Sequence, residues 1–273
     1  MNDEPLILTV APNGAYKTRA DHAALPITPE ALAATARACL DAGAAMLHLH
    51  VRHPDGRHSL RADHYRAAQA AVRAAVGHNL VIQVTTEAAG VYDPAEQVAL
   101  VLELQPEAVS VSLRELLRPG LSETELSGFF GWLLANQTMT QVILYDTAEV
   151  AQWNQLRARG VVPEGPWFVL FVLGRYAAGQ TSAATDLLPF LHTRDGAHPW
   201  AMCAFGAQEH RCAMAALALG GHVRVGFENN LWRRDGSLAP DNASLVRQVA
   251  ESAALAGRPL ASAAQVRSRF RGE

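Results

Sequence analysis

The stretch Met46-Leu47-His48-Leu49-His50-Val51 joins an apolar run of strand length to two histidines that stand two positions apart. Because successive side chains of a strand point to opposite faces, both histidines are expected on one face, with Leu47 and Leu49 on the other. An apolar run without a polar face is typical of a strand covered on both sides, as in a parallel sheet wrapped by helices. The stretch therefore predicts a buried strand that carries two imidazoles near its carboxyl end.

Seven further runs of this kind recur at roughly even spacing, and each is followed by a stretch of helical length. They are Leu6–Val10, Leu80–Thr85, Ala108–Ser112, Gln141–Tyr145, Trp167–Leu173, Trp200–Ala204 and His222–Gly226. Eight such βα units favour a closed (β/α)8 barrel, a TIM barrel, with residues 1–273 as a single metal-dependent domain. An open doubly wound sheet with an extra edge strand is the alternative.

Signals for helix starts and ends fall between the strand runs. Four segments place a side-chain acceptor at the N-cap, with Glu three residues later or Pro in the first turn. These segments begin at Thr28, Asp93, Ser122 and Asp146. Three helical stretches are followed by a glycine where a left-handed cap is expected, namely Gly43, Gly77 and Gly160.

Composition excludes several classes of function. The chain of 273 residues is 49% hydrophobic and 18% charged, with a formal net charge of −3, which is typical of a soluble globular protein. A nucleic-acid-binding surface would need clustered Lys and Arg. The three cysteines form no paired motif, and no apolar stretch is long enough to span a bilayer. We therefore expect a cytoplasmic protein that binds neither nucleic acid nor membranes.

The two histidines lie where a barrel places its chemistry, near the carboxyl end of a strand. Glu228 follows the last strand run. Because the first, second and last strands of a barrel are neighbours, this carboxylate is expected to face His48 and His50 and to complete a site for a divalent ion. The alternatives are one core histidine with one loop histidine, and a surface acid in a loop.

Other polar residues are expected at the same mouth of the barrel. Arg224 stands near the end of the last run with an inward side chain, and such a buried cation usually pairs with a substrate carboxylate or a local acid. Thr85 ends the third run, and Ser110 and Ser112 share one face of the fourth. Gly14 lies in a turn whose backbone N–H groups suit an anion. Motifs for nucleotide hydrolysis, dinucleotide binding and the common hydrolase triads are absent.

A longer pattern resembles the β-keto acid cleavage enzyme family, whose namesake is 3-keto-5-aminohexanoate cleavage enzyme. The resemblance spans nearly the whole chain. Its main segments are Leu6-Ile7-Leu8-Thr9, Leu25-Pro26-Ile27-Thr28-Pro29-Glu30, His48-Leu49-His50-Val51-Arg52, Phe171-Val172-Leu173-Gly174 and Gly220-Gly221-His222-Val223-Arg224-Val225-Gly226-Phe227-Glu228. Such a string is far more specific than the two histidines alone.

The resemblance implies a barrel that exchanges acyl groups: a β-keto acid and acetyl-CoA become acetoacetate and a new acyl-CoA by a retro-Claisen route. It implies zinc, or another divalent ion, on His48, His50 and Glu228. It also implies that Arg224 stabilises negative charge and that Thr85 contacts the substrate. Family analogy suggests a homotetramer. We expect further substrate contacts at Gly14, Tyr16, Ser110 and Ser112.

The chain departs from the family pattern at residues that carry the chemistry. We count Asn229 with Arg224, Thr85 and Glu87 among the catalytic residues. Asn229 stands where the family usually has Asp, however, and an amide cannot act as a carboxylate base at neutral pH. Glu87 stands in place of a family glycine, and we hypothesise that it is the substitute base. A structural salt bridge between Glu87 and Arg114 is the alternative. Ser112 replaces a family Asn, and the altered positions together predict a different substrate.

Two further hypotheses compete with the acyltransferase. One is a metal-dependent retro-aldol lyase on the same scaffold, which would need no CoA. The other is a catalytically impaired barrel that binds a metabolite, an idea suggested by Asn229.

Overall fold

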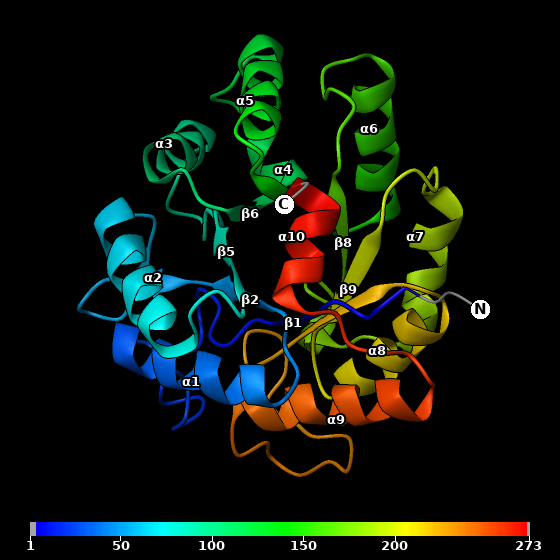
Figure 1. The fold of residues 1–273 in the computed structure, drawn as a ribbon. Helices are drawn as coiled ribbons and strands as arrows, with labels where there is room; N and C mark the ends of the chain where they lie inside the picture. The colour runs from blue at the N-terminus through cyan, green and yellow to red at the C-terminus, as the bar shows by residue number, and fades with distance from the viewer. Residues whose placement is uncertain (1–3, 272–273) are drawn as a thin grey trace.

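The computed structural model describes residues 4–271, and its centre is a closed barrel of eight parallel strands (Figure 1). The barrel strands are β1 (Leu8–Val10), β2 (Met46–Leu49), β5 (Val81–Thr85), β6 (Ala108–Ser112), β7 (Met139–Leu144), β8 (Phe168–Leu173), β9 (Trp200–Ala204) and β10 (His222–Val225). Because β1 pairs with both β2 and β10, the sheet has no free edge. The predicted eight-stranded barrel is confirmed, and the open sheet is wrong.

Helices surround this barrel (Figure 1). They are α1 (Pro29–Asp41), α2 (Ala62–Val76), α3 (Pro94–Leu104), α4 (Leu113–Leu116), α5 (Glu123–Ala135), α6 (Thr147–Ala158), α7 (Leu187–Thr193), α8 (Glu209–Ala218), α9 (Asn242–Leu255) and α10 (Ala263–Arg271), with the 3-10 turns η1 (Ala178–Gln180) and η2 (Ala184–Asp186). Among residues 4–271, no helix has the length and apolar character needed to cross a membrane.

The predicted N-terminal helix caps are formed. The side chains of Thr28, Asp93, Ser122 and Asp146 each accept a hydrogen bond from the backbone N–H three residues later. Asp93 and Ser122 each form the reciprocal capping box, so the first N–H groups of α3 and α5 are satisfied locally. The three predicted glycines all have positive φ, as expected at these helix ends. Gly77, with φ 57° and ψ −133°, lies outside the left-handed helical region, so its predicted left-handed cap is wrong.

Alternation along the strands separates two apolar layers. Leu47 and Leu49 of β2 pack outward into the layer shared with the helices, as predicted. Met46 belongs instead to the barrel interior, with Val81 and Phe168. His48 points to the same face of the strand as Met46, and it lies two residues closer to the carboxyl end of the strand. The inward face of β2 is therefore apolar where the strand begins and polar where it ends.

The predicted second strand is shorter than expected. The barrel pairing of β2 ends at Leu49, and His50 belongs to no strand. The chain then forms a two-stranded antiparallel hairpin, β3 (Val51–Arg52) with β4 (His58–Ser59). The turn between them is closed by a hydrogen bond from the N–H of Gly56 to the carbonyl of His53. This hairpin draws the backbone out of the barrel directly after His50.

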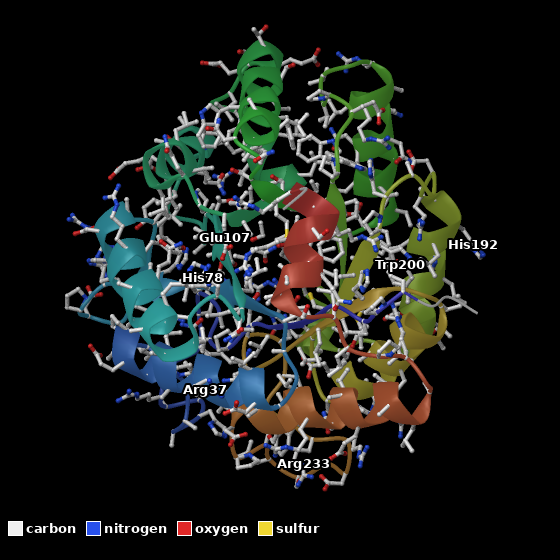
Figure 2. The ribbon with its side chains drawn as sticks, in the orientation of Figure 1. Arg37, His78, Glu107, His192, Trp200 and Arg233 are labelled. Carbon is white, nitrogen blue, oxygen red and sulfur yellow. The ribbon has the colours of Figure 1, made fainter. Side chains whose placement is uncertain are left out.

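Helix α10 covers the end of the barrel at which the strands begin (Figure 1). Phe270 packs on Phe168 of β8 in the barrel interior, with the ring centroids 5.0 Å apart. On one flank of the helix, Arg267 donates to Oε2 of Glu107 at 3.0 Å and to the carbonyl of His78 at 2.7 Å. Glu107 and His78 are labelled in Figure 2. Helix α10 therefore covers this end, and the main cavity lies at the carboxyl ends of the strands.

Shortening the side chain of Phe270 in α10 is expected to lower the stability of the protein without changing the cavity at the carboxyl ends of the strands. Phe270→Ala removes an aromatic side chain that is 4% exposed, which typically costs about 3 kcal/mol of unfolding free energy. Urea unfolding followed by circular dichroism measures this. Leu255→Ala is the control, because Leu255 is 88% exposed and should change the free energy by less than about 0.5 kcal/mol. Equal small effects in both variants would contradict a packed Phe270.

Candidate metal centre and active site

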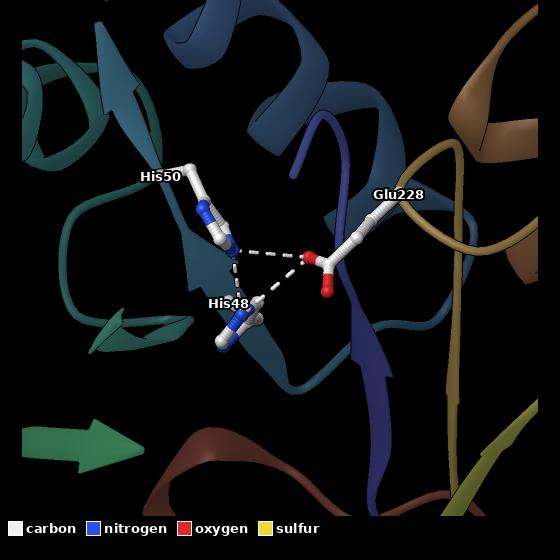
Figure 3. Close-up of side chains that lie close together, drawn as sticks. All are labelled: His48, His50 and Glu228. Carbon is white, nitrogen blue, oxygen red and sulfur yellow. Dashed lines mark hydrogen bonds and ion pairs between the residues drawn. The ribbon is translucent and has the colours of Figure 1, made fainter. Parts of the chain in front are cut away.

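Three side chains from distant parts of the sequence meet at the carboxyl end of the barrel (Figure 3). His48 lies in β2, His50 follows it, and Glu228 follows β10. They meet because only β1 separates β2 from β10 in the closed barrel. The Nε2 atoms of His48 and His50 are 3.0 Å apart. Oε2 of Glu228 lies 3.5 Å from Nε2 of His48 and 3.2 Å from Nε2 of His50. We call these three residues the donor triangle.

The donor triangle fits a divalent ion. In a tetrahedral zinc site, ligand distances of about 2.0–2.2 Å place neighbouring donor atoms roughly 3.3–3.5 Å apart, close to the observed spacing. Oε2 of Glu228, which faces both histidines, is buried and has no hydrogen-bond partner within residues 4–271. Two imidazole nitrogens and one carboxylate oxygen are also the donor set of known catalytic zinc sites, which keep a fourth position open.

Burial and charge set the protonation states within the triangle. Burial, followed by the charge of Arg224, lowers the pKa of His48 to about 3, so its imidazole is neutral at physiological pH. Burial alone would raise the pKa of Glu228, but the charge of Arg224 beside it holds this pKa well below its ordinary value. A neutral imidazole and an ionised carboxylate are the forms that bind a metal ion.

Arg224 connects the donor triangle to the open cavity. Its Nη2 donates to Oε1 of Glu228 at 3.0 Å and to Sγ of Cys203 at 3.2 Å. Its Nε and Nη1 are buried, and the described part of the chain offers neither of them a hydrogen-bond partner. A buried guanidinium with free donors suits a carboxylate or a developing negative charge.

A cavity of about 590 Å³ borders the triangle, a size that is typical of small-molecule sites. Most of the predicted site residues line it: Gly14, Tyr16, His48, Thr85, Glu87, Ser110, Ser112, Arg224 and Glu228. The hydroxyls of Ser110 and Ser112 are buried and have no hydrogen-bond partner among the described residues. Two predicted residues, His50 and Asn229, do not line the cavity.

Glu87 lies between the triangle and the cavity. Its Oε2 is 3.9 Å from Nε2 of His50, and its Oε1 is 3.5 Å from Nη2 of Arg175. Burial raises the pKa of this carboxyl above its ordinary value. A carboxyl with these neighbours can exchange a proton with a molecule in the cavity.

The alternative salt bridge between Glu87 and Arg114 is wrong. Arg114 pairs instead with Asp146, at 2.9 Å, and with Glu149. Arg114 lies in α4, and its guanidinium packs over the ring of Tyr145 toward the N-terminus of α6. The short helix α4 therefore directs Arg114 away from Glu87, and Arg175 takes its place.

The side chain of Asn229 is buried away from the cavity. It is 3% exposed, and within residues 4–271 neither its Oδ1 nor its Nδ2 has a hydrogen-bond partner.

The carboxyl of Glu209 accepts from the N–H of Gly226 at 3.3 Å and from Nδ2 of Asn230 at 3.1 Å. Glu209 thereby holds the loop on both sides of Glu228, and burial raises the pKa of Glu209 to about 8.

The sequence pattern did not identify three residues of the site. Arg175 stacks on Tyr16, with its Cζ 4.8 Å from the ring centroid, and Lys17 donates to the carbonyl of Glu228 at 2.7 Å. Gln83 contacts His48 from inside the barrel. Arg175 follows the carboxyl end of β8, and Gln83 is a polar residue at an inward position, so both positions carried a usable signal.

Known proteins are similar to this sequence over nearly its whole length. The family model of beta-keto acid cleavage enzymes matches residues 5–271. The chain is 28% identical to 3-keto-5-aminohexanoate cleavage enzyme of Acetoanaerobium sticklandii, with 97% of each chain aligned. It is also 28% identical to 3-oxoadipate:acetyl-CoA acetyltransferase of Cupriavidus necator, with 97% of this chain and 94% of that protein aligned.

Among solved structures, the apo structure of ObcA is similar with a TM-score of 0.72 at 20% identity. The match covers 90% of this chain, which spans only 65% of the length of ObcA. At this identity the likeness shows the barrel fold alone. The family match extends over nearly every residue of the sequence, and it includes the donor triangle. The chain therefore belongs to the β-keto acid cleavage enzyme family.

Proposed function

We propose that this protein is a metal-dependent acyltransferase that acts on a β-keto acid and acetyl-CoA. The overall reaction would be R–CO–CH2–COO⁻ plus acetyl-CoA giving R–CO–CoA plus acetoacetate, by a retro-Claisen route. The observation that carries the proposal is the donor triangle beside the free donors of Arg224. The names of the two relatives, a keto acid cleavage enzyme and an acetyl-CoA acetyltransferase, support the same class of reaction.

His48, His50 and Glu228 would hold the divalent ion. Zinc is the first candidate because of the donor set, and another divalent metal would satisfy the same proposal. When bound, such an ion polarises the keto and carboxylate oxygens of the acid and so acidifies the protons on the carbon between them. Every other part of the proposed chemistry falls to side chains of this chain.

Arg224 would bind the substrate carboxylate through one of its free N–H donors and stabilise the negative charge that develops beside it. This contact orients the acid with its reactive carbon toward the cavity. Further contacts are proposed for the lining residues Gly14, Tyr16, Thr85, Ser110 and Ser112. The unpartnered hydroxyls of the two serines support this assignment, because buried polar groups are normally hydrogen-bonded.

Glu87 is the proposed base that removes the proton from the reactive carbon. It lines the cavity beside the donor triangle, and its raised pKa brings the carboxyl closer to the range in which proton transfer near neutral pH is efficient. Asn229, which was expected among the catalytic residues, presents no ionisable group and is buried outside the cavity lining. In this proposal Asn229 takes no proton.

The proposal treats residues 1–273 as one metal-dependent domain that works in the cytoplasm on small molecules. Assembly into a homotetramer belongs to it by family analogy, and analytical ultracentrifugation of the purified chain tests that part. A dimeric or monomeric mass would leave the proposed reaction untouched and remove only the tetramer.

The proposed reaction is tested with purified protein, metal analysis and a panel of β-keto acids. We expect one equivalent of zinc or another divalent ion per chain, and acetoacetate only when both a keto acid and acetyl-CoA are present. Consumption of a keto acid without acetyl-CoA would instead indicate a retro-aldol lyase. Bound metal without turnover of any acid would indicate a metabolite-binding barrel.

A further inference from the structure

Two glutamines form a hydrogen-bonded chain with His48 inside the barrel. Oε1 of Gln83, in β5, lies 2.8 Å from Nδ1 of His48. Nε2 of Gln83 donates to Oε1 of Gln141, in β7, at 3.3 Å. Both glutamines are 1% exposed or less, and neither is among the described residues that line the cavity. This series of hydrogen bonds therefore lies inside the protein, on the side of His48 opposite to the donor triangle.

The barrel register explains how the glutamines meet. Strand β6 stands between β5 and β7, with Ala108 paired to Gln83 and Ser110 paired to Gln141. These two small side chains leave room above β6, so the long amides can reach each other across it. Larger residues at these positions would separate the glutamines.

The hydrogen bonds specify which nitrogen of His48 carries the proton. Nε2 of His48 faces His50 and Glu228, so in a metal site it is the nitrogen that offers its lone pair. Nδ1 must then carry the proton and donate it to Oε1 of Gln83. The amide N–H of Gln83 is already engaged by Gln141, which leaves that oxygen turned toward His48.

We infer that Gln83, supported by Gln141, positions His48 as a metal ligand and selects its Nδ1–H tautomer. This inference rests on the metal role proposed for His48. Partners of this kind typically contribute 10–100-fold to metal affinity. An uncharged amide raises the basicity of the imidazole less than a carboxylate would, so more of the charge of a bound ion remains available to polarise a substrate.

The test measures zinc affinity of the full chain by competition with a chromogenic chelator. Gln83→Leu keeps the approximate volume but removes the acceptor, and we expect zinc to bind about 10–100-fold more weakly. Gln83→Glu retains an oxygen acceptor in either protonation state and should bind zinc as tightly as the wild type or more tightly. Gln141→Leu should weaken binding less, because the bond from His48 to Gln83 stays in place.

Thr140→Val is the matched control. Thr140 is buried in the same strand as Gln141 but has the opposite parity, and its hydroxyl donates to the carbonyl of Thr138. Its zinc affinity should equal that of the wild type. Thermal unfolding of the metal-free proteins separates loss of the ligand's position from loss of the fold.

Wild-type zinc affinity in Gln83→Leu would overturn the inference, whether or not its unfolding temperature falls. If that variant does not fold, Gln141→Leu decides: weaker zinc binding supports the inference, and unchanged binding overturns it. A wild-type chain that binds no divalent ion would remove the metal proposal and this inference with it. These outcomes are distinguishable because none of the measurements depends on turnover of a keto acid.

Discussion

His48→Ala is expected to lose both the bound divalent ion and nearly all activity. The substitution removes one of three donor atoms that lie within 4.8 Å of one another. Metal ions typically supply several kcal/mol of transition-state stabilisation, and a loss of about 4 kcal/mol corresponds to roughly 10³ in kcat. The measurements are metal content by mass spectrometry and the rate of acetoacetate formation with a substrate of the wild-type enzyme.

Glu228→Gln provides a second variant of nearly identical shape. It removes the anionic ligand and leaves Arg224 without its carboxylate partner, so zinc content and kcat should fall together. His64→Ala is the control: His64 lies in the neighbouring helix α2, and its Nδ1 contacts the hydroxyl of Ser59 outside the donor triangle. A His48→Ala variant that retains full zinc and full activity would refute the assignment of the triangle.

Glu87→Gln is expected to abolish most turnover while leaving the metal in place. Loss of a general base typically lowers kcat by about 10²- to 10⁴-fold. The amide keeps the size of the side chain, and Glu87 lies 3.9 Å from His50, outside the three donors. Exchange of the protons next to the keto group with deuterium, followed by NMR without acetyl-CoA, should slow to the same extent.

Glu115→Gln is the comparison for this prediction. Glu115 also lines the cavity, but its Oε2 already accepts from the N–H of Ala88 at 3.0 Å and from Nε2 of Gln97 at 2.8 Å. Its substitution should therefore change the exchange rate little. Activity like that of the wild type in Glu87→Gln would exclude Glu87 as the base, and loss confined to Glu115→Gln would transfer the role to Glu115.

Much of the fold could be predicted because its signals are local. Eight apolar runs of strand length, separated by capped helices, are compatible with few architectures, and the pleat alone places Leu47 and His48 on opposite faces. Strand ends were predicted less well. The run through Val51 looks continuous in sequence, but the turn at Gly56 pairs Val51 with Ser59 and takes it out of the barrel.

The convergence of His48 and Glu228 could also be foreseen, because closing a barrel makes its first, second and last strands neighbours whatever their sequences. The partner of Glu87 could not. Arg114 is the nearer candidate along the chain, yet α4 turns it toward Asp146, and Arg175 arrives from the loop after β8. Loop residues contact segments that are far away in sequence, and the hydrophobic periodicity of the sequence does not predict such contacts.

The sequence by itself determined the barrel, the family resemblance and the placement of two imidazoles near one strand end, because side-chain alternation and strand order are properties of the chain. Only the tertiary structure decided how the charges around those imidazoles are satisfied. In the folded structure His48 is hydrogen-bonded to Gln83, and Glu87 forms an ion pair with Arg175. Asn229 is buried outside the cavity lining. The physical reason is that hydrogen bonds and ion pairs depend on distances of a few ångströms between elements, which packing sets after the strands have closed.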